Sequence, residues 1–165
     1  MNDSQDDLGQ VAHAHGRRSA TITRRFDHPP ERLWACLTAS DMLPLWLAPG
    51  ELEPRKGGRA RLDFADSGTV IDSEVLLWEP QHAVTYSWSG PGEPERPVAW
   101  RLDPDESGCR LTLELSVPED EDAARAFAGW IAHLDMLAAT LEGVSIKFPF
   151  ERFKTAREAY KALLA

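Results

Sequence analysis

The chain has 165 residues, of which 42% are hydrophobic and 27% are charged, and its formal net charge is −9. These values are typical of one soluble globular domain with its own core. The negative charge excludes a nucleic-acid-binding surface, which needs basic side chains against the phosphates. No apolar run approaches the ~18 residues of a membrane span, and no signal-peptide pattern opens the chain. We therefore expect a cytoplasmic protein with neither nucleic acid nor membrane as partner.

Residues 1–17 are polar and acidic and show no apolar period. This composition predicts a disordered leader that makes few contacts with the rest of the chain. His13 and His15 lie in this leader, and Cys36 and Cys109 lie outside any metal-ligand spacing. We expect the cysteines to be buried free thiols, and we expect no metal site and no cofactor.

Ordered structure is expected from residue 18. A strand is predicted over residues 20–26, and Pro30 suits the first turn of a helix over residues 31–38. A second short helix over residues 42–47 is ended by Pro49-Gly50. The two short helices would form a bracket that interrupts a sheet.

Six further strands are predicted from residue 52 to residue 117. Three of them alternate clearly, and their apolar residues are Val84, Tyr86 and Trp88, then Val98, Trp100 and Leu102, then Leu111, Leu113, Leu115 and Val117. Asp66-Ser67-Gly68 is read as a turn. The strand over residues 69–78 is ambiguous, because Ile71, Val75 and Leu77 define one face and Val70, Leu76 and Trp78 define the other.

Two amphipathic helices are predicted after the strands. The first runs from Ala123 to Leu141, and its apolar stripe consists of Phe127, Trp130, Ile131, Leu134, Leu137, Ala138 and Leu141. The second follows Phe148-Pro149-Phe150 and has the stripe Phe153, Ala156, Tyr160, Leu163 and Leu164. A lone helix of that length is marginal in water. We expect it to dock on its own domain, with homodimerisation as the alternative.

These elements resemble a known family. The residues that carry the resemblance are Pro30 and Trp34, Trp46-Leu47 with Pro49, Gly57-Gly58, Glu79-Pro80, Tyr86 and Trp88, and Gly129-Trp130 with Leu141-Glu142-Gly143. Together they are similar to the bacterial branch of the activator of heat-shock-protein-90 ATPase homologue family, in the START/SRPBCC superfamily typified by birch pollen allergen. The resemblance implies an α+β helix-grip fold over residues 18–145. The helix predicted within residues 146–165 is appended to this domain and exceeds the family pattern. The resemblance also implies a cavity between the sheet and the long helix that binds hydrophobic small molecules.

The predicted site is the space between the sheet and the long helix. The residues expected to line it are Trp46, Phe64, Tyr86, Trp88, Trp100, Trp130, Leu134 and Leu137. Large aromatic side chains there either fill the core or stack a flat apolar ligand. Because the phosphate-binding, nucleotide-binding and hydrolase motifs are absent from the sequence, a binding protein is expected ahead of an enzyme.

Three residues are candidates for catalysis. Asp72 and Glu74 share one face of the ambiguous strand, so both point into the cavity or both point to solvent. His133 flanks the apolar stripe of the long helix and is a candidate general base. If a carboxylate faces inward, a cyclase or hydrolase that uses Glu74 or Asp72 with His133 is the alternative function. A protein-interaction module, either chaperone-associated or dimerising, is the third hypothesis.

Overall fold

One antiparallel sheet of eight strands forms the body of the computed structural model, which describes residues 7–64 and 69–165. The strands are β1 (Gln10–Ala14), β2 (Arg17–Phe26), β3 (Gly50–Leu52), β4 (Arg59–Phe64), β5 (Thr69–Glu79), β6 (Ala83–Ser87), β7 (Pro97–Pro104) and β8 (Cys109–Pro118). Their order is β1-β2-β8-β7-β6-β5-β4-β3, and every neighbouring pair is antiparallel. The predicted turn at Asp66-Ser67-Gly68 lies outside the described residues.

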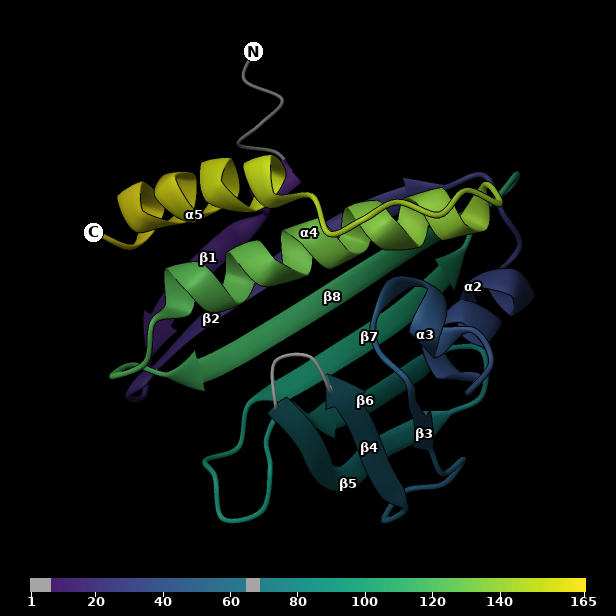
Figure 1. Cartoon of the computed structure of the whole chain (residues 1–165), viewed down its shortest axis with the longest axis horizontal. Coiled ribbons are helices and arrows are strands. Elements are labelled where there is room, and N and C mark those ends of the chain that lie inside the picture. Colours follow the sequence, from purple (N-terminus) through teal and green to yellow (C-terminus); the bar gives the residue numbers. More distant parts are fainter. Residues whose placement is uncertain (1–6, 65–68) are drawn as a thin grey trace.

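Four helices accompany the sheet in the described part of the chain. They are α2 (Pro30–Thr38), α3 (Leu43–Trp46), α4 (Ala123–Leu141) and α5 (Phe150–Leu164). Helix α4 lies across one face of the sheet, and α2 and α3 lie beside its C-terminal half (Figure 1). The side chain of Asp122 caps α4 by accepting a hydrogen bond from the backbone N–H of Arg125 at 3.1 Å. The predicted α+β helix-grip fold is confirmed.

The apolar face of α4 forms the core together with the inward residues of the strands. Phe127, Ile131 and Leu137 on α4 are fully buried, as are Val84, Leu113 and Leu62 on three of the strands. Each of these strands shows the period-2 pattern that its sequence predicts, with its apolar side chains turned toward α4.

A β-bulge explains the ambiguous strand. Val75 pairs with Tyr86 and Leu77 pairs with Thr85, so Leu76 is an extra residue on β5. Up to the bulge the odd-numbered Ile71 and Val75 are buried, whereas beyond it Leu77 is exposed and Trp78 packs against the core. The inward-facing residues of β5 are therefore odd-numbered before the bulge and even-numbered after it. Each of the two faces that the sequence offered is the inward one for part of the strand.

The prediction of a disordered leader over residues 1–17 is wrong for residues 7–17, which the structure describes. Residues 10–14 form β1, which pairs with β2 through a two-residue turn at His15 and Gly16, both with positive φ. Leu8 is buried and its carbonyl oxygen accepts a hydrogen bond from the hydroxyl of Tyr160 at 2.7 Å. Because β1 is an edge strand whose side chains are largely exposed, it carries no apolar alternation. Residues 1–6 of the predicted leader lie outside the described residues.

Helix α5 docks on its own domain, as expected. Ala156 and Tyr160 are buried, and the Tyr160 ring contacts Phe127 of α4 with centroids 5.5 Å apart. Arg152 of α5 pairs with Asp135 of α4 at 3.3 Å and with Asp7 of the leader at 3.1 Å. The leader and α5 therefore cover each other on the outside of α4.

Replacing Leu8 tests this mutual covering. We expect Leu8→Ala to lower the free energy of unfolding by about 2–5 kcal/mol, because it removes a fully buried side chain. The matched change Leu163→Ala, at an exposed position of α5, should cost less than about 0.5 kcal/mol. Urea unfolding of both variants measures the difference, and equal midpoints would show that the leader contributes nothing.

Candidate functional site

The predicted ligand-binding residues all lie between α4 and the sheet. Trp46 of α3, Tyr86 of β6, Trp100 of β7 and Trp130 of α4 are buried, and Phe64 and Trp88 are partly buried against the same core. Leu134 and Leu137 are buried on the apolar face of α4. The structure thus brings together the aromatic residues that the sequence predicted, while their role in binding stays a prediction.

These rings form a continuous network of edge-on contacts. Trp130 is central, because its ring centroid lies 4.8 Å from that of Trp88 and 5.6 Å from that of Trp100. Trp100 in turn contacts Trp46 at 5.7 Å, and Trp88 contacts Phe64 at 5.6 Å. Aromatic pairs in this arrangement stabilise by about 0.5–1.5 kcal/mol each beyond the area they bury. We call Phe64, Tyr86, Trp88, Trp100 and Trp130 the aromatic cluster.

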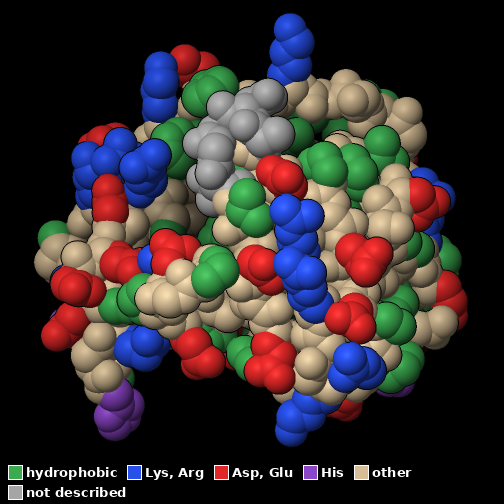
Figure 2. Space-filling view, turned by 60° about the horizontal axis from the view of Figure 1, so that its bottom comes forward, with side chains coloured by type: hydrophobic (Ala, Val, Ile, Leu, Met, Phe, Trp, Pro, Cys, Tyr) green, Lys and Arg blue, Asp and Glu red, His purple; other side chains and the backbone are tan. Residues whose placement is uncertain are grey.

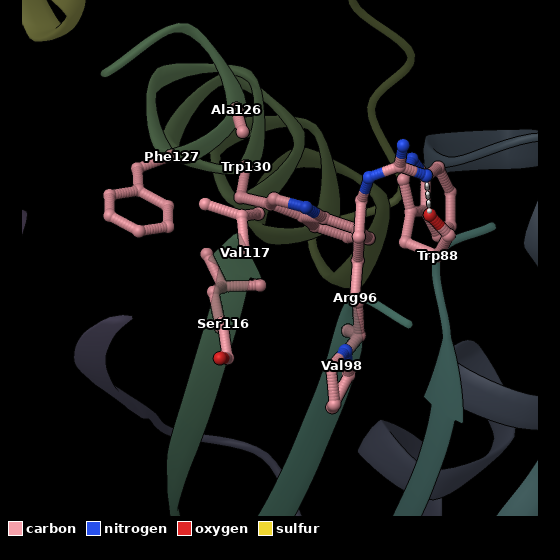
Figure 3. Close-up of a pocket in the computed structure, with 10 residues that line it drawn as sticks. Trp88, Arg96, Val98, Ser116, Val117, Ala126, Phe127 and Trp130 are labelled. Carbon is pink, nitrogen blue, oxygen red and sulfur yellow. Dashed lines mark hydrogen bonds between the residues drawn. The ribbon is translucent and has the colours of Figure 1, made fainter. Parts of the chain in front are cut away.

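The aromatic cluster fills most of the space that the sequence predicted as a cavity. Beside Trp88 and Trp130 a cavity of about 30 Å³ remains, with Arg96, Val117 and Ala126 among its lining residues (Figure 3). A site for a drug-sized ligand needs roughly 300 Å³ or more. This cavity is therefore too small for such a ligand unless the rings beside it move. A second, polar hollow of about 400 Å³ lies over β3 and β4 and is lined mainly by charged side chains such as Arg59, Arg61 and Asp63.

Two indole N–H groups in and beside the cluster form hydrogen bonds. The indole N–H of Trp46 donates to the carbonyl of Cys36 at 2.7 Å, and that of Trp100 donates to the hydroxyl of Tyr86 at 3.3 Å. Burial raises the pKa of Tyr86 well above its ordinary value, so this hydroxyl stays neutral. The interior therefore favours an uncharged ligand.

His133 is the titratable candidate that reaches this interior. It lies one turn beyond Trp130 on α4, and its ring contacts Trp130 at 5.9 Å and Phe64 at 6.2 Å. Its Nδ1 lies 2.9 Å from the carbonyl oxygen of Trp46. A carbonyl only accepts, so Nδ1 carries the proton. Burial lowers the pKa of His133 below 6.5, with the hydrogen bond to Trp46 opposing this shift, so the ring is neutral near pH 7.

The two carboxylate candidates do not reach the site. Asp72 receives two hydrogen bonds from the guanidinium of Arg59, at 3.0 and 2.8 Å, on the outer face of the sheet. The hydrogen bonds from Arg59 lower the pKa of the Asp72 carboxyl. Glu74 is exposed, opposite Arg59 on the neighbouring strand. Acidic and basic side chains lie interspersed over the face shown in Figure 2. The enzyme hypothesis required one of these carboxylates beside His133, and this pairing is wrong. Before the bulge the odd-numbered residues of β5 face the core, so the even-numbered Asp72 and Glu74 face outward.

Two residues at the site were missed by sequence reasoning. Arg96 lines the cavity and is held by Glu121 at 2.7 Å and by the carbonyl oxygen of Trp88 at 3.0 Å (Figure 3). Phe148, read as part of a connector, places its ring 5.6 Å from that of His133. The apolar Phe148-Pro149-Phe150 was the available signal for the second residue, whereas Arg96 lies in a charged loop that gave none.

The fold, with α4 gripped by a curved antiparallel sheet around an apolar interior, defines a helix-grip domain. The family model described as activator of Hsp90 ATPase homolog 1-like protein matches residues 27–142. The chain belongs to this family. A search of curated proteins found no match.

Solved structures support the same fold. CalU16 from Micromonospora echinospora is 25% identical and superposes with a TM-score of 0.75, over 93% of this chain and 98% of that one. The protein encoded by BPP1335 from Bordetella parapertussis is 28% identical, with a TM-score of 0.73 over 93% of this chain and 89% of that one. DynU16, described as a putative protein in the dynemicin biosynthetic locus, is 28% identical with a TM-score of 0.68, over 75% of this chain but only 47% of its own length.

Two further observations bear on the predicted partners. None of the helices in residues 7–64 and 69–165 is long and apolar enough to cross a membrane. Within those same residues, no three side chains of the types that bind metal ions are gathered into a group.

The pH dependence of stability tests the burial of neutral His133. Below about pH 6.5 the unfolded chain binds a proton at this histidine that the folded protein excludes, so the free energy of unfolding falls as the pH decreases toward the folded pKa. Above pH 6.5 His133 is neutral in both states and contributes no slope.

The matched variant is His133→Asn, whose amide can keep the donor to the Trp46 carbonyl but does not titrate. Urea unfolding between about pH 7 and pH 5 should show a shallower loss of stability in this variant than in the natural protein. Identical slopes would show that His133 is not buried in its neutral form.

Proposed function

We propose that this protein binds a small, flat, uncharged apolar or aromatic molecule between α4 and the sheet, and that it does so without catalysing a reaction. The observation that carries the proposal is the aromatic cluster itself. Tryptophan and phenylalanine side chains from the sheet and α4 meet edge-on in one place, with Tyr86 tilted against Trp88 at 6.5 Å, beside an unfilled volume. A guest ring inserted there replaces one aromatic contact by another of similar energy.

The unfilled volume supplies room for opening. The cavity lies between the Trp88–Trp130 contact and Phe127, and Ala126 borders it on α4. If the Trp130 ring turns into this volume, its contact with Trp88 opens, and the space between the two rings can receive a flat molecule. Such side-chain rearrangement is common in ligand binding and leaves the backbone of the sheet in place.

The two alternative functions have less support. The enzyme hypothesis needed a carboxylate beside His133, but Asp72 and Glu74 lie on the outer face. The interaction hypothesis needed an exposed stripe on α5, but Ala156 and Tyr160 are buried against the domain. The similar structure of DynU16, described as a putative protein in the dynemicin biosynthetic locus, is consistent with the proposal of small-molecule binding for this chain.

Calorimetric titration with 2-methoxynaphthalene, an uncharged flat probe, tests the proposal. We expect binding in the micromolar range, accompanied by a change in tryptophan emission as the Trp88–Trp130 contact opens. Failure of this probe and of 2-naphthol to bind at solubility-limited concentrations would contradict the proposed function.

Ala126→Leu tests the opening step. The larger side chain fills the cavity, so the Trp130 ring loses the room to turn, and affinity for the probe should fall about tenfold or more. Arg125→Leu, which adds the same side chain at the exposed neighbouring position, is the control and should bind as the natural protein does. Equal affinity of the two variants would show that ring displacement into this cavity is not required.

A further inference from the structure

The connector between α4 and α5 places an aromatic ring over His133. After Gly143 the chain turns back and runs along α4 before α5 begins (Figure 1). The Phe148 ring contacts His133 at 5.6 Å, Phe150 at 4.9 Å and Phe153 at 5.9 Å. Because His133 in turn contacts Phe64 and Trp130, Phe148 extends the aromatic cluster to the surface of the molecule.

The connector is weakly held apart from this ring. Val144 donates a backbone hydrogen bond to Ala139, and Phe150 donates one to Phe148. Among the described residues, the backbone groups of residues 145–147 make no hydrogen bond to the rest of the chain, and the side chains of Val144 and Ile146 are exposed. Displacing the Phe148 side chain therefore breaks ring contacts, and the backbone hydrogen bond at Phe148 is a local one from Phe150.

His133, which the Phe148 ring contacts, has a hydrogen-bond acceptor, Nε2, to which no described residue donates. Nδ1 of His133 is committed to the Trp46 carbonyl, so in the neutral ring Nε2 has a free lone pair. The side-chain nitrogens that are both fully buried and unpartnered in the described part of the chain belong to Arg18, Arg24 and Arg157, and Nε2 of His133 is not among them. A ligand that carries a hydrogen-bond donor can bond to this acceptor, and that hydrogen bond stabilises the complex.

We propose that Phe148 is a built-in plug of the binding site, and that the ligand is a hydroxylated flat aromatic molecule of the phenol or naphthol class. The ligand enters beside Trp130, where the contact with Trp88 opens, and displaces the Phe148 ring from His133, so that its hydroxyl can donate to Nε2. This inference rests on the proposed function and adds to it the chemical class of the ligand and the element that competes with it. An uncharged hydroxyl suits the site because the rings of Phe64, Trp130 and Phe148 surround the His133 imidazole.

The hydroxyl is tested by a pair of probes that differ only in their donor. Calorimetric titration at neutral pH compares 2-naphthol with 2-methoxynaphthalene, in which the oxygen carries a methyl group and cannot donate. We expect the natural protein to prefer 2-naphthol by roughly three- to tenfold, the effect of one net hydrogen bond. In His133→Asn, which lacks an acceptor at the position of Nε2, the preference should shrink to less than about twofold.

The plug is tested by Phe148→Ala. Removal of the ring should raise the affinity for both probes several-fold and leave the preference for 2-naphthol intact. Phe150→Ala is the matched control, because this residue contacts Phe148 but is itself exposed and lies two positions further along the chain. Circular dichroism of each variant establishes that it is folded before titration.

The outcomes separate this inference from the proposed function. Binding of both probes with equal affinity, or a preference that survives in His133→Asn, overturns the hydroxyl contact while small-molecule binding stands. An affinity of Phe148→Ala no higher than that of Phe150→Ala overturns the plug. Failure of both probes to bind the natural protein and Phe148→Ala overturns the proposed function, and the inference with it.

Discussion

Burial of the apolar face of α4 against the sheet is the interaction on which the other elements depend. Most of the stability of a helix in a protein comes from packing of its apolar face, and each large side chain such as Phe127 or Leu137 gains about 1.5–3 kcal/mol on burial. The sheet has to wrap around the helix to cover that face. The bulge at Leu76 serves this wrapping, because it changes the twist of β5 and lets Trp78 continue the covering surface beyond Val75.

The two ends of this interface are packed differently. Around Leu134, Leu137 and Leu141 the helix presents aliphatic side chains, which interlock into a fixed core. Around Trp130 the contact is made by flat rings that meet edge-on, and a small volume is left unfilled beside them. A ring turns about few bonds and keeps much of its contact area in a second orientation. The aromatic end is therefore the part of the core where we propose that a guest molecule is accommodated without loss of the fold.

The elements predicted correctly from the sequence are those in which buried apolar residues recur with a clear period. Helix α4 and strands β6 to β8 were expected within a few residues of their actual bounds, and the inward tryptophans were expected to meet. Strand β1 was missed because an edge strand is held by backbone pairing to β2, and its exposed side chains leave no periodic signal. The facing of Asp72 and Glu74 was undecided because one inserted residue, Leu76, reverses the parity of β5. The extent to which rings fill the predicted cavity depends on their orientations and on the path of the connector. Both are set by tertiary contacts, which no local sequence pattern encodes.

The mutual covering of the leader and α5 limits how far the proposed site can open. Arg152, in the first turn of α5, is held by Asp7 and Asp135, and Tyr160 fixes the far end of the helix to Leu8. Phe148 lies directly before this anchored helix, and Val144 directly after α4 is tied to Ala139. Only the few residues between these two fixed points are free to move without breaking ion pairs or helical hydrogen bonds. So short a segment can withdraw one ring and little more, which matches a ligand of one or two fused rings and not a long-chain lipid.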